Sequence, residues 1–123
     1  MAEPGHNLRG GTTVTADPNR SGVVYAWVNQ NLTNGSITKS TDGGATWSTV
    51  FPTTAPIYNI TVDPENSDIV YAPTMGRGAF KSTDGGQRWA LMSGLSPTGI
   101  SIIVVDPSDS QVLYAGTHDD GVW

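Results

Sequence analysis

The sequence predicts an all-β protein built from repeated four-stranded antiparallel sheets, and three observations support this class. First, the phrase STDGGATW at 40–47 returns as STDGGQRW at 82–89, which is 42 residues later. Second, 15 Gly and 8 Pro accompany abundant Ser, Thr and Asn, as in chains of short strands joined by turns. Third, no segment of ten or more residues has apolar residues spaced for a helix. A fixed period of about 40–50 residues indicates a repeat architecture.

Two shorter signals recur in step with this phrase. Asp-Pro occurs at 17–18, 63–64 and 106–107, and Val-Tyr-Ala or Leu-Tyr-Ala occurs at 24–26, 70–72 and 113–115. Together they divide the chain into unit one (12–54), unit two (55–97) and an incomplete unit three (98–123). Residues 1–11 form an N-terminal segment that could complete a unit.

Unit two shows the expected order of strands most clearly. Asn59–Val62 alternates in polarity and stops at Asp63-Pro64, where the proline lacks an N–H for the ladder. Three more strands are predicted after it, at 68–72, 78–81 and 88–92. Unit one repeats the order with strands at 13–16, 23–28, 36–39 and 46–50. Unit three offers 100–105, 112–115 and 121–123.

Four antiparallel strands per period, in a simple meander, are typical of the blade of a β-propeller. Helical repeats such as ankyrin and tetratricopeptide arrays need a helical period, and the coils of a parallel β-helix are shorter than this repeat. We therefore predict about three propeller blades in the chain.

The repeated phrase predicts a tight turn between the third and fourth strands of a unit. An Asp carboxylate can accept hydrogen bonds from backbone N–H groups two or three residues further on, and glycines allow positive φ. The Trp that follows is large enough to fill space between adjacent sheets. Asp42 and Asp84 are accordingly predicted to form turns rather than to act in catalysis or bind metal.

The phrase resembles the Asp-box, or BNR repeat, of sialidases, xyloglucanase-type glycoside hydrolases, sortilin-like receptors and a photosystem assembly factor. The resemblance covers residues 12–123 and implies a propeller. Its structural positions here are Ser40, Asp42, Gly44, Trp47, Ser82, Asp84, Gly86 and Trp89. The core between blades is predicted to contain Tyr25, Tyr71, Tyr114, Trp47 and Trp89. Turn residues are predicted at Asp17, Asp63 and Asp106.

Ligand-binding residues are predicted on the face opposite the repeated turns, where the loops between the second and third strands are longer and more varied. Amides, an Arg fork and carboxylates suit the hydroxyl groups of sugars, although they equally suit a solvated loop. The candidates are Asn29, Gln30, Asn31, Asn34, Arg77, His118, Asp119 and Asp120.

Catalysis by this chain has weaker support. The segment YAGTHDDG at 114–121 is similar to the xyloglucanase-type segment in which a catalytic Asp follows a Tyr-containing strand, so Asp119 and Asp120 are weak catalytic candidates. Glycoside hydrolysis needs two carboxylates, and no motif identifies the second. A sialidase would need three clustered arginines, whereas those here fall at unrelated repeat positions.

Composition excludes several other classes. Six basic against 11 acidic residues give a net charge of −5, which disfavours nucleic-acid binding. No apolar run approaches the roughly 18 residues of a membrane span. There is no Cys, and His6 and His118 are isolated, so no metal site and no cofactor is predicted.

Three blades are fewer than the roughly 4–8 of known propellers, so two open sheet faces are expected. We expect a ring of identical chains, with a dimer of about six blades favoured, and the alternative is a fragment of a longer propeller. No secretion signal is present in the chain, and the resemblance implies a secreted or extracytoplasmic protein.

The functional expectation is a non-enzymatic Asp-box propeller module that binds a glycan or protein, or acts as a scaffold. The alternative is part of a glycoside hydrolase of xyloglucanase or sialidase type. A third reading is a purely structural fragment without a ligand.

Overall fold

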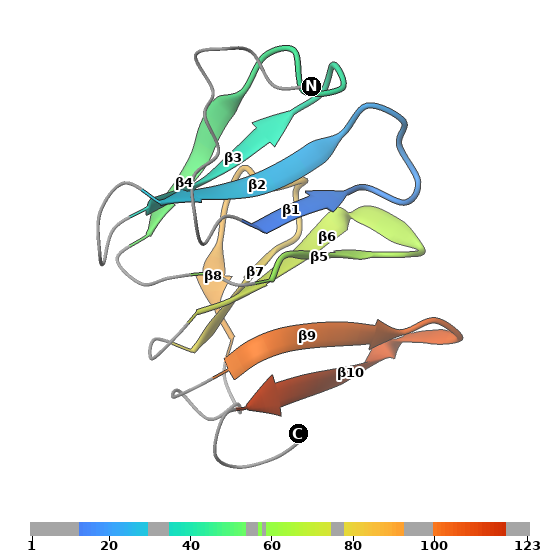
Figure 1. Ribbon diagram of the computed structural model, residues 1–123. Coiled ribbons are helices and arrows are strands. Elements are labelled where there is room, and N and C mark those ends of the chain that lie inside the picture. Colours follow the sequence, from blue (N-terminus) through green and yellow to red (C-terminus); the bar gives the residue numbers. More distant parts are fainter. Residues whose placement is uncertain are drawn as a thin grey trace.

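The computed structural model describes residues 13–29, 35–53, 57, 59–74, 78–92 and 100–117. These residues form ten strands in three antiparallel sheets, and no helix occurs among them. Figure 1 shows the sheets following one another in chain order, with unit two between units one and three. The described part of the chain therefore has no helix able to cross a membrane.

Each complete unit is a simple meander in which sequential strands are neighbours. The first sheet consists of β1 (Thr13–Ala16), β2 (Val24–Asn29), β3 (Gly35–Ser40) and β4 (Ser48–Thr53). The second consists of β5 (Thr61–Asp63), β6 (Asn66–Pro73), β7 (Ala79–Ser82) and β8 (Ala90–Leu91). The third contains β9 (Ile100–Asp106) and β10 (Asp109–Thr117), and the strand predicted at 121–123 lies outside the described residues.

The hairpins at Asp63-Pro64 and Asp106-Pro107 are tighter than predicted. Asp63 pairs with Asn66, and Asp106 pairs with Asp109. Only two residues therefore separate the paired positions in each of these hairpins. The second strands of units two and three, predicted to begin at 68 and 112, therefore begin earlier, at Asn66 and Asp109. The proline occupies a turn position that donates no ladder hydrogen bond, so its missing N–H does not end the pairing.

The fourth strands begin later than predicted. Strand β4 starts at Ser48 rather than 46, and β8 starts at Ala90 rather than 88. The reason is that the backbone N–H groups of Thr46 and Arg88 are bonded to the carboxylates of Asp42 and Asp84. An N–H used in the turn is not available for a sheet ladder.

The core lies between the sheets rather than within any one of them. The first cluster joins Tyr25, Trp27 and Ile37 of unit one to Ile60 and Val70 of unit two, among others. A second cluster joins Tyr71 and Ala79 of unit two to Ile103, Val105 and Ala115 of unit three. Each sheet thus depends on its neighbour to bury an apolar face.

Aromatic rings extend the first interface toward its outer edge. The ring of Phe51 on β4 stacks on Trp89 with 5.6 Å between centroids, and it contacts Phe80 of β7 at 5.2 Å. The predicted position of Trp89 between the sheets is therefore confirmed. Trp47, at the same position of unit one, has no such partner ring among the described residues.

A glycine permits the deepest aromatic packing in unit one. Trp27 is 2% exposed and its Nε1 donates to Oγ1 of Thr53 at 2.9 Å. A Cβ at Gly35 would lie 2.4 Å from the Trp27 ring, so the close approach of β3 to this ring requires glycine.

The outward faces of the first and third sheets are open. Val14 of β1 is 55% exposed, and Ile102 and Val104 of β9 are 43% and 46% exposed. Tyr114 is 46% exposed, so its predicted place in the core was wrong. Its side chain has no further sheet to pack against among the described residues, whereas Tyr25 and Tyr71 each face one.

Candidate functional site

The repeated turns are closed by a Ser–Asp pair. In unit one, Ser40 Oγ donates to Asp42 Oδ1 at 2.8 Å and accepts from the backbone N–H of Gly44 at 2.9 Å. Asp42 then accepts from the N–H of Thr46 at 2.9 Å and from its hydroxyl at 2.6 Å. The carboxylate reaches four residues along the chain, further than the two or three expected, and the serine hydroxyl links it to the start of the turn.

Unit two repeats this geometry. Ser82 Oγ donates to Asp84 Oδ1 at 2.9 Å and accepts from Gly86 N–H at 2.8 Å. The backbone N–H groups of Gln87 and Arg88 donate to Asp84 at 3.1 and 2.9 Å. The serine was predicted to belong to the motif. Its hydroxyl group was not predicted to bond both the Asp carboxylate and a backbone N–H group of the turn.

These hydrogen bonds change the acidity of the two carboxyl groups. Bonds from Thr46 and Ser40 lower the pKa of Asp42 to about 2, and bonds led by the Arg88 N–H lower the pKa of Asp84. Both groups are therefore ionised acceptors at neutral pH, and neither is suited to donate a proton in catalysis. The predicted structural role of both Asp residues agrees with this geometry.

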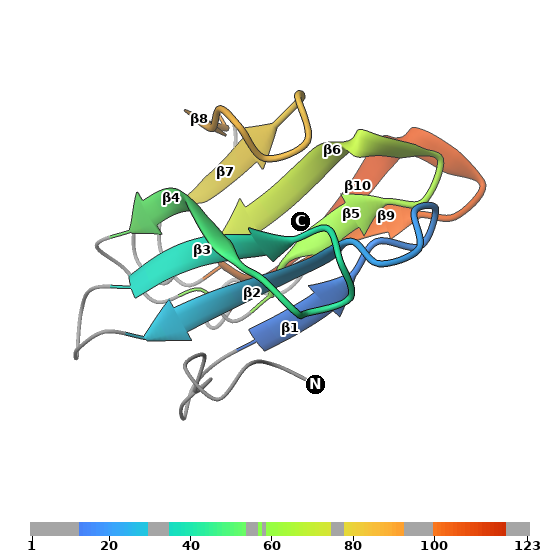
Figure 2. The same cartoon turned by 90° about the horizontal axis from the view of Figure 1, so that it is seen from above.

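Each turn also touches the first hairpin of its own sheet. The N–H of Gly43 donates to the carbonyl of Gly22, and that of Gly85 donates to the carbonyl of Asp68, both at 2.9 Å. The repeated turns and the β1–β2 and β5–β6 turns consequently share one end of the sheets, as the meander predicts. Figure 2 shows the β1–β2, β5–β6 and β9–β10 hairpins pointing to the same side.

The repeated turn of unit two also accepts hydrogen bonds from two side chains of unit one. The hydroxyl of Tyr25 and the Nζ of Lys39 each donate to the carbonyl oxygen of Gly85 at 2.9 Å. Lys39 Nζ lies 5.4 Å from the centroid of the Tyr25 ring. Burial raises the pKa of Tyr25 to about 12, which keeps its hydroxyl a donor.

A second contact between units uses the Asp of each Asp-Pro pair. Ser67 Oγ of unit two donates to Asp17 Oδ1 at 2.7 Å, and Ser110 Oγ of unit three donates to Asp63 Oδ1 at 2.8 Å. Ser21 holds the corresponding position in unit one and is exposed. These Asp residues therefore shape a turn and also bind the next sheet.

A third contact uses threonine. Thr15 Oγ1 donates to the carbonyl of Ile60 at 2.7 Å, and Thr61 Oγ1 donates to that of Ile103 at 2.6 Å. Unit three has Val104 at this repeat position and so lacks the hydroxyl.

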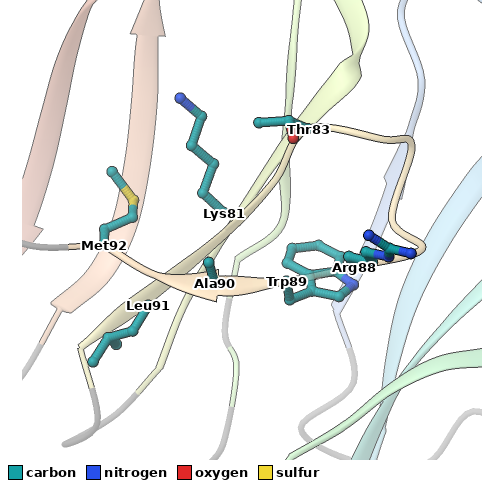
Figure 3. A pocket seen from close by; sticks show the side chains of 7 residues that line it. All are labelled: Lys81, Thr83, Arg88, Trp89, Ala90, Leu91 and Met92. Atoms are coloured by element: carbon teal, nitrogen blue, oxygen red, sulfur yellow. The ribbon is translucent and has the colours of Figure 1, made fainter.

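Two cavities border unit two, and Lys81 lines both. The larger, of about 650 Å³, is also lined by Arg88, Trp89 and Met92 (Figure 3). The smaller, of about 340 Å³, is bordered by Tyr71, Asp63 and other polar residues of units two and three. Sequence analysis identified neither.

The predicted ligand-binding residues lie almost entirely outside the described residues. Asn29 ends β2 opposite Gly35 in the register. Those outside are Gln30, Asn31, Asn34, Arg77, His118, Asp119 and Asp120. The described part of the chain holds no group of three or more His, Cys, Asp or Glu able to bind a metal ion.

Comparisons with known proteins relate the chain to glycoside hydrolases. A xyloglucanase of Hypocrea jecorina (strain QM6a) is 38% identical over 112 residues, covering 79% of this chain and 13% of that protein. The chain thus spans about an eighth of the curated relative's length. No model of a known protein family matches the sequence.

Solved structures agree on the fold. The Niastella koreensis GH74 enzyme superposes with a TM-score of 0.76 at 28% identity, over 91% of this chain and 20% of that chain. An ancestral GH74 enzyme superposes with a TM-score of 0.67 at 20% identity, over 89% and 16%, which bears on the fold alone.

The three sheets, their meander order and these superpositions define a run of partial β-propeller blades, and the predicted fold class is confirmed. More particularly, the fold is that of a glycoside hydrolase-like propeller.

Proposed function

We propose that the chain is a section of an Asp-box propeller that acts as a scaffold and presents its loops to a carbohydrate or protein ligand, without catalysing a reaction itself. The Ser–Asp turns have the hydrogen bonding that suits the Asp-box, with one carboxylate closing each turn. The ligand loops would be those at 29–35, 73–78 and 116–120.

One observation supports the non-catalytic role above others: five of the seven described Asp side chains accept hydrogen bonds that hold the fold. Asp17 and Asp63 bind the next unit, Asp42 and Asp84 close the repeated turns, and Asp106 accepts from Ser108. A glycoside hydrolase needs two carboxyl groups free to face a sugar ring, one of them able to carry a proton.

The proposal is tested by measuring binding and turnover on the same preparation. We expect saturable binding on a glycan array or to a protein ligand, and no release of reducing sugar from xyloglucan. Arg77→Ala and Asn31→Ala should weaken binding while leaving the melting temperature unchanged. Asp84→Ala should lower the melting temperature, because it opens a turn. Turnover of xyloglucan by the wild-type chain would contradict the scaffold proposal.

The second candidate is a piece of a glycoside hydrolase, and the 38% identity to a xyloglucanase favours it. In that case Asp119 or Asp120 would supply one carboxyl group, and the other would come from the rest of a larger propeller. Hydrolysis abolished by Asp119→Asn or Asp120→Asn, but retained by Asp109→Asn, would support this alternative. A secreted or extracytoplasmic location is part of either proposal.

Association of identical chains into a ring belongs to the proposal as well. The apolar faces of Val14 on unit one and of Ile102 and Val104 on unit three are open. Asp106 and Ser21 occupy the repeat positions that bind each other in the Asp17–Ser67 and Asp63–Ser110 contacts. Two chains would supply about six blades, within the range of closed propellers.

A further inference from the structure

The serine hydroxyl that joins units one and two has one hydrogen-bond acceptor and one donor beside it. Ser67 Oγ donates to Asp17 Oδ1 at 2.7 Å and accepts from Asn19 Nδ2 at 3.1 Å. A serine hydroxyl carries a single proton, and here the amide of Asn19 supplies the second hydrogen. The two bonds of this hydroxyl are therefore chemically matched.

At the junction of units two and three, a carboxyl group takes the place of that amide. Ser110 Oγ lies 2.8 Å from Asp63 Oδ1 and 3.0 Å from Glu65 Oε1. Asn19 and Glu65 hold the same repeat position, two residues after the Asp of an Asp-Pro pair, and each backbone N–H donates to that Asp at 2.8 Å. The backbone is thus alike at both positions, and the side chain differs.

The contact of Ser110 is short of one hydrogen. Ionised carboxylates only accept hydrogen bonds, so the single hydroxyl proton cannot fully serve both Asp63 and Glu65. Two carboxylates that share one site also repel each other. Asp63 is 1% exposed, so water has little access to its side of the contact, whereas Glu65 is exposed. Glu65 is therefore the carboxyl group that can exchange a proton with solvent.

Charged and titratable groups on the neighbouring elements do not supply this hydrogen. They are Tyr71 and Asp68 on β6, Lys81 on β7, Asp106 on β9, Asp109 on β10, and Asp17 and Arg20 at the β1–β2 hairpin. Lys81 lines the smaller cavity beside Asp63 and Glu65, but it forms no ion pair with either of them among the described residues. Arg20 is paired with Asp68 at 3.3 Å.

We propose that Glu65, Ser110 and Asp63 form a pH-sensitive contact that tightens the junction of units two and three in acid. When Glu65 takes up a proton from solvent, its carboxyl group donates to Ser110 Oγ, and Ser110 Oγ donates to Asp63 Oδ1. This chain of bonds reproduces the one that Asn19 and Ser67 make toward Asp17. Release of the proton removes the first bond and restores the repulsion. The inference depends on the fold and not on the proposed function.

The direction of the effect follows from the number of protons bound in each state. In the folded chain the Glu65 proton has Ser110 Oγ as an acceptor, which the unfolded chain lacks, so folding favours the protonated form at this contact. The stability that the contact contributes is therefore present in acid and is lost as pH rises. The Asp42 and Asp84 turns behave in the opposite way, because their lowered pKa values make them weaken in acid.

Glu65→Gln tests the contact on the full chain, because it supplies an amide N–H at every pH, as Asn19 does. We expect a higher urea midpoint than in the wild type at pH 7, and we expect this gain to shrink as the pH is lowered to about 4, where glutamate ordinarily titrates. Hydrogen exchange followed by mass spectrometry gives a local readout. Residues 100–117 should exchange more slowly in Glu65→Gln than in the wild type at pH 7.

Three further variants separate the contact from a general effect of charge. Asp109→Asn removes one negative charge from the facing hairpin and should not reproduce the gain. Ser110→Ala removes the shared hydroxyl, so adding Glu65→Gln to it should give little or no gain. Asn19→Asp places the carboxyl pair at the first junction, and should lower the urea midpoint at pH 7 by an amount that is partly regained in acid. Circular dichroism of each variant establishes that the sheets are retained.

Three results would overturn the proposal. The first is equal urea midpoints and equal exchange in Glu65→Gln and the wild type at pH 7. The second is a gain from Glu65→Gln that is the same at pH 7 and pH 4 or is retained in full in the Ser110→Ala background. The third is an equal gain from Asp109→Asn, which would show that relief of charge is sufficient. Asn19→Asp keeps the test decisive if Ser110→Ala does not fold, since a loss that acid does not reverse also contradicts the contact.

Discussion

The hydroxyl of Ser67 donates a 2.7 Å hydrogen bond to Oδ1 of Asp17, and this bond ties the second sheet to the first. Asp17 is only 7% exposed, and its Oδ2 is buried without a partner. The serine is therefore one of few polar groups that compensate this carboxylate for its loss of water.

Replacing this serine should destabilise the protein measurably. Ser67→Ala leaves Asp17 without its partner from the next unit, and we expect a loss of about 1–3 kcal/mol in the free energy of unfolding. Ser48→Ala removes an exposed hydroxyl group on β4 and should cost less than about 0.5 kcal/mol. Urea unfolding of both variants gives the comparison, and equal effects would contradict the contact.

The two tryptophans of the repeated turns should differ in importance. Trp89 stacks on Phe51 of the neighbouring sheet. The indole N–H of Trp47 instead donates a hydrogen bond within its own turn, to the Gly44 carbonyl at 3.0 Å. Trp89→Ala should cost about 3 kcal/mol, because it opens a gap between sheets. Trp47→Ala should cost roughly 1 kcal/mol. A larger loss of melting temperature for Trp47→Ala would show that the interface is placed wrongly.

Acid should weaken the repeated turns. The pKa of Asp42 is lowered from 3.8 to about 2 in the folded chain, and the pKa of Asp84 is lowered too. Because the folded pKa lies below the unfolded one, the stabilisation is present above about pH 4 and is lost as pH falls toward 2. Unfolding midpoints between pH 5 and pH 2 should decline in the wild type, and decline less in Asp42→Asn/Asp84→Asn.

Thr46→Ala is the finer test of the same effect. The Thr46 hydroxyl is the largest cause of the lowered pKa of Asp42, and unit two has Arg88 at this position. The variant should move the Asp42 pKa toward 3.8, which NMR titration of its carboxyl carbon can follow. An unchanged titration would contradict the hydrogen bonding of the turn.

Alkaline pH should weaken the interface between units one and two. Burial raises the pKa of Tyr25 from 10.0 to about 12. Since the folded pKa is the higher one, the stabilisation is complete below pH 10 and is lost between pH 10 and 12. Burial also raises the pKa of Tyr71. Absorbance at the tyrosinate band should therefore show a late phase that Tyr25→Phe reduces and that Tyr114→Phe, at an exposed position, does not.

The open faces predict the state of association. If chains form a ring, light scattering after size exclusion should give at least twice the chain mass of 12.9 kDa. Val104→Glu places a charge on the open face of unit three and should return the protein to monomers. A wild-type monomer at all concentrations would contradict the ring.

The repeats made most of the fold predictable. The recurring phrase and the Asp-Pro pairs predicted the meander order of both four-stranded sheets, and β1 has the predicted bounds of 13–16. The predicted starts of the fourth strands were wrong because Asp side chains accept hydrogen bonds from the N–H groups of Thr46 and Arg88. Those N–H groups are therefore not available for pairing between strands. Tyr114 was misplaced because its burial depends on a neighbouring sheet, which no local pattern reports.

The contacts between units were less predictable, although some left a signal. Serine at 21, 67 and 110 and lysine at 39 and 81 recur at fixed repeat positions. Their periodicity marks a shared role, but which sheet each contacts is decided by packing across units. The loop residues chosen for ligand binding remain predictions.

Val104 should make a junction formed on the third sheet sensitive to cold. A threonine hydroxyl donates a hydrogen bond across each of the two described junctions between sheets. A neighbour packed on the third sheet would contact Ile102 and Val104 without such a bond. Attraction between hydrocarbon surfaces weakens on cooling. Chilling should therefore loosen this outermost junction before the inner two, so that any assembly formed through it comes apart in the cold while the sheets themselves stay folded.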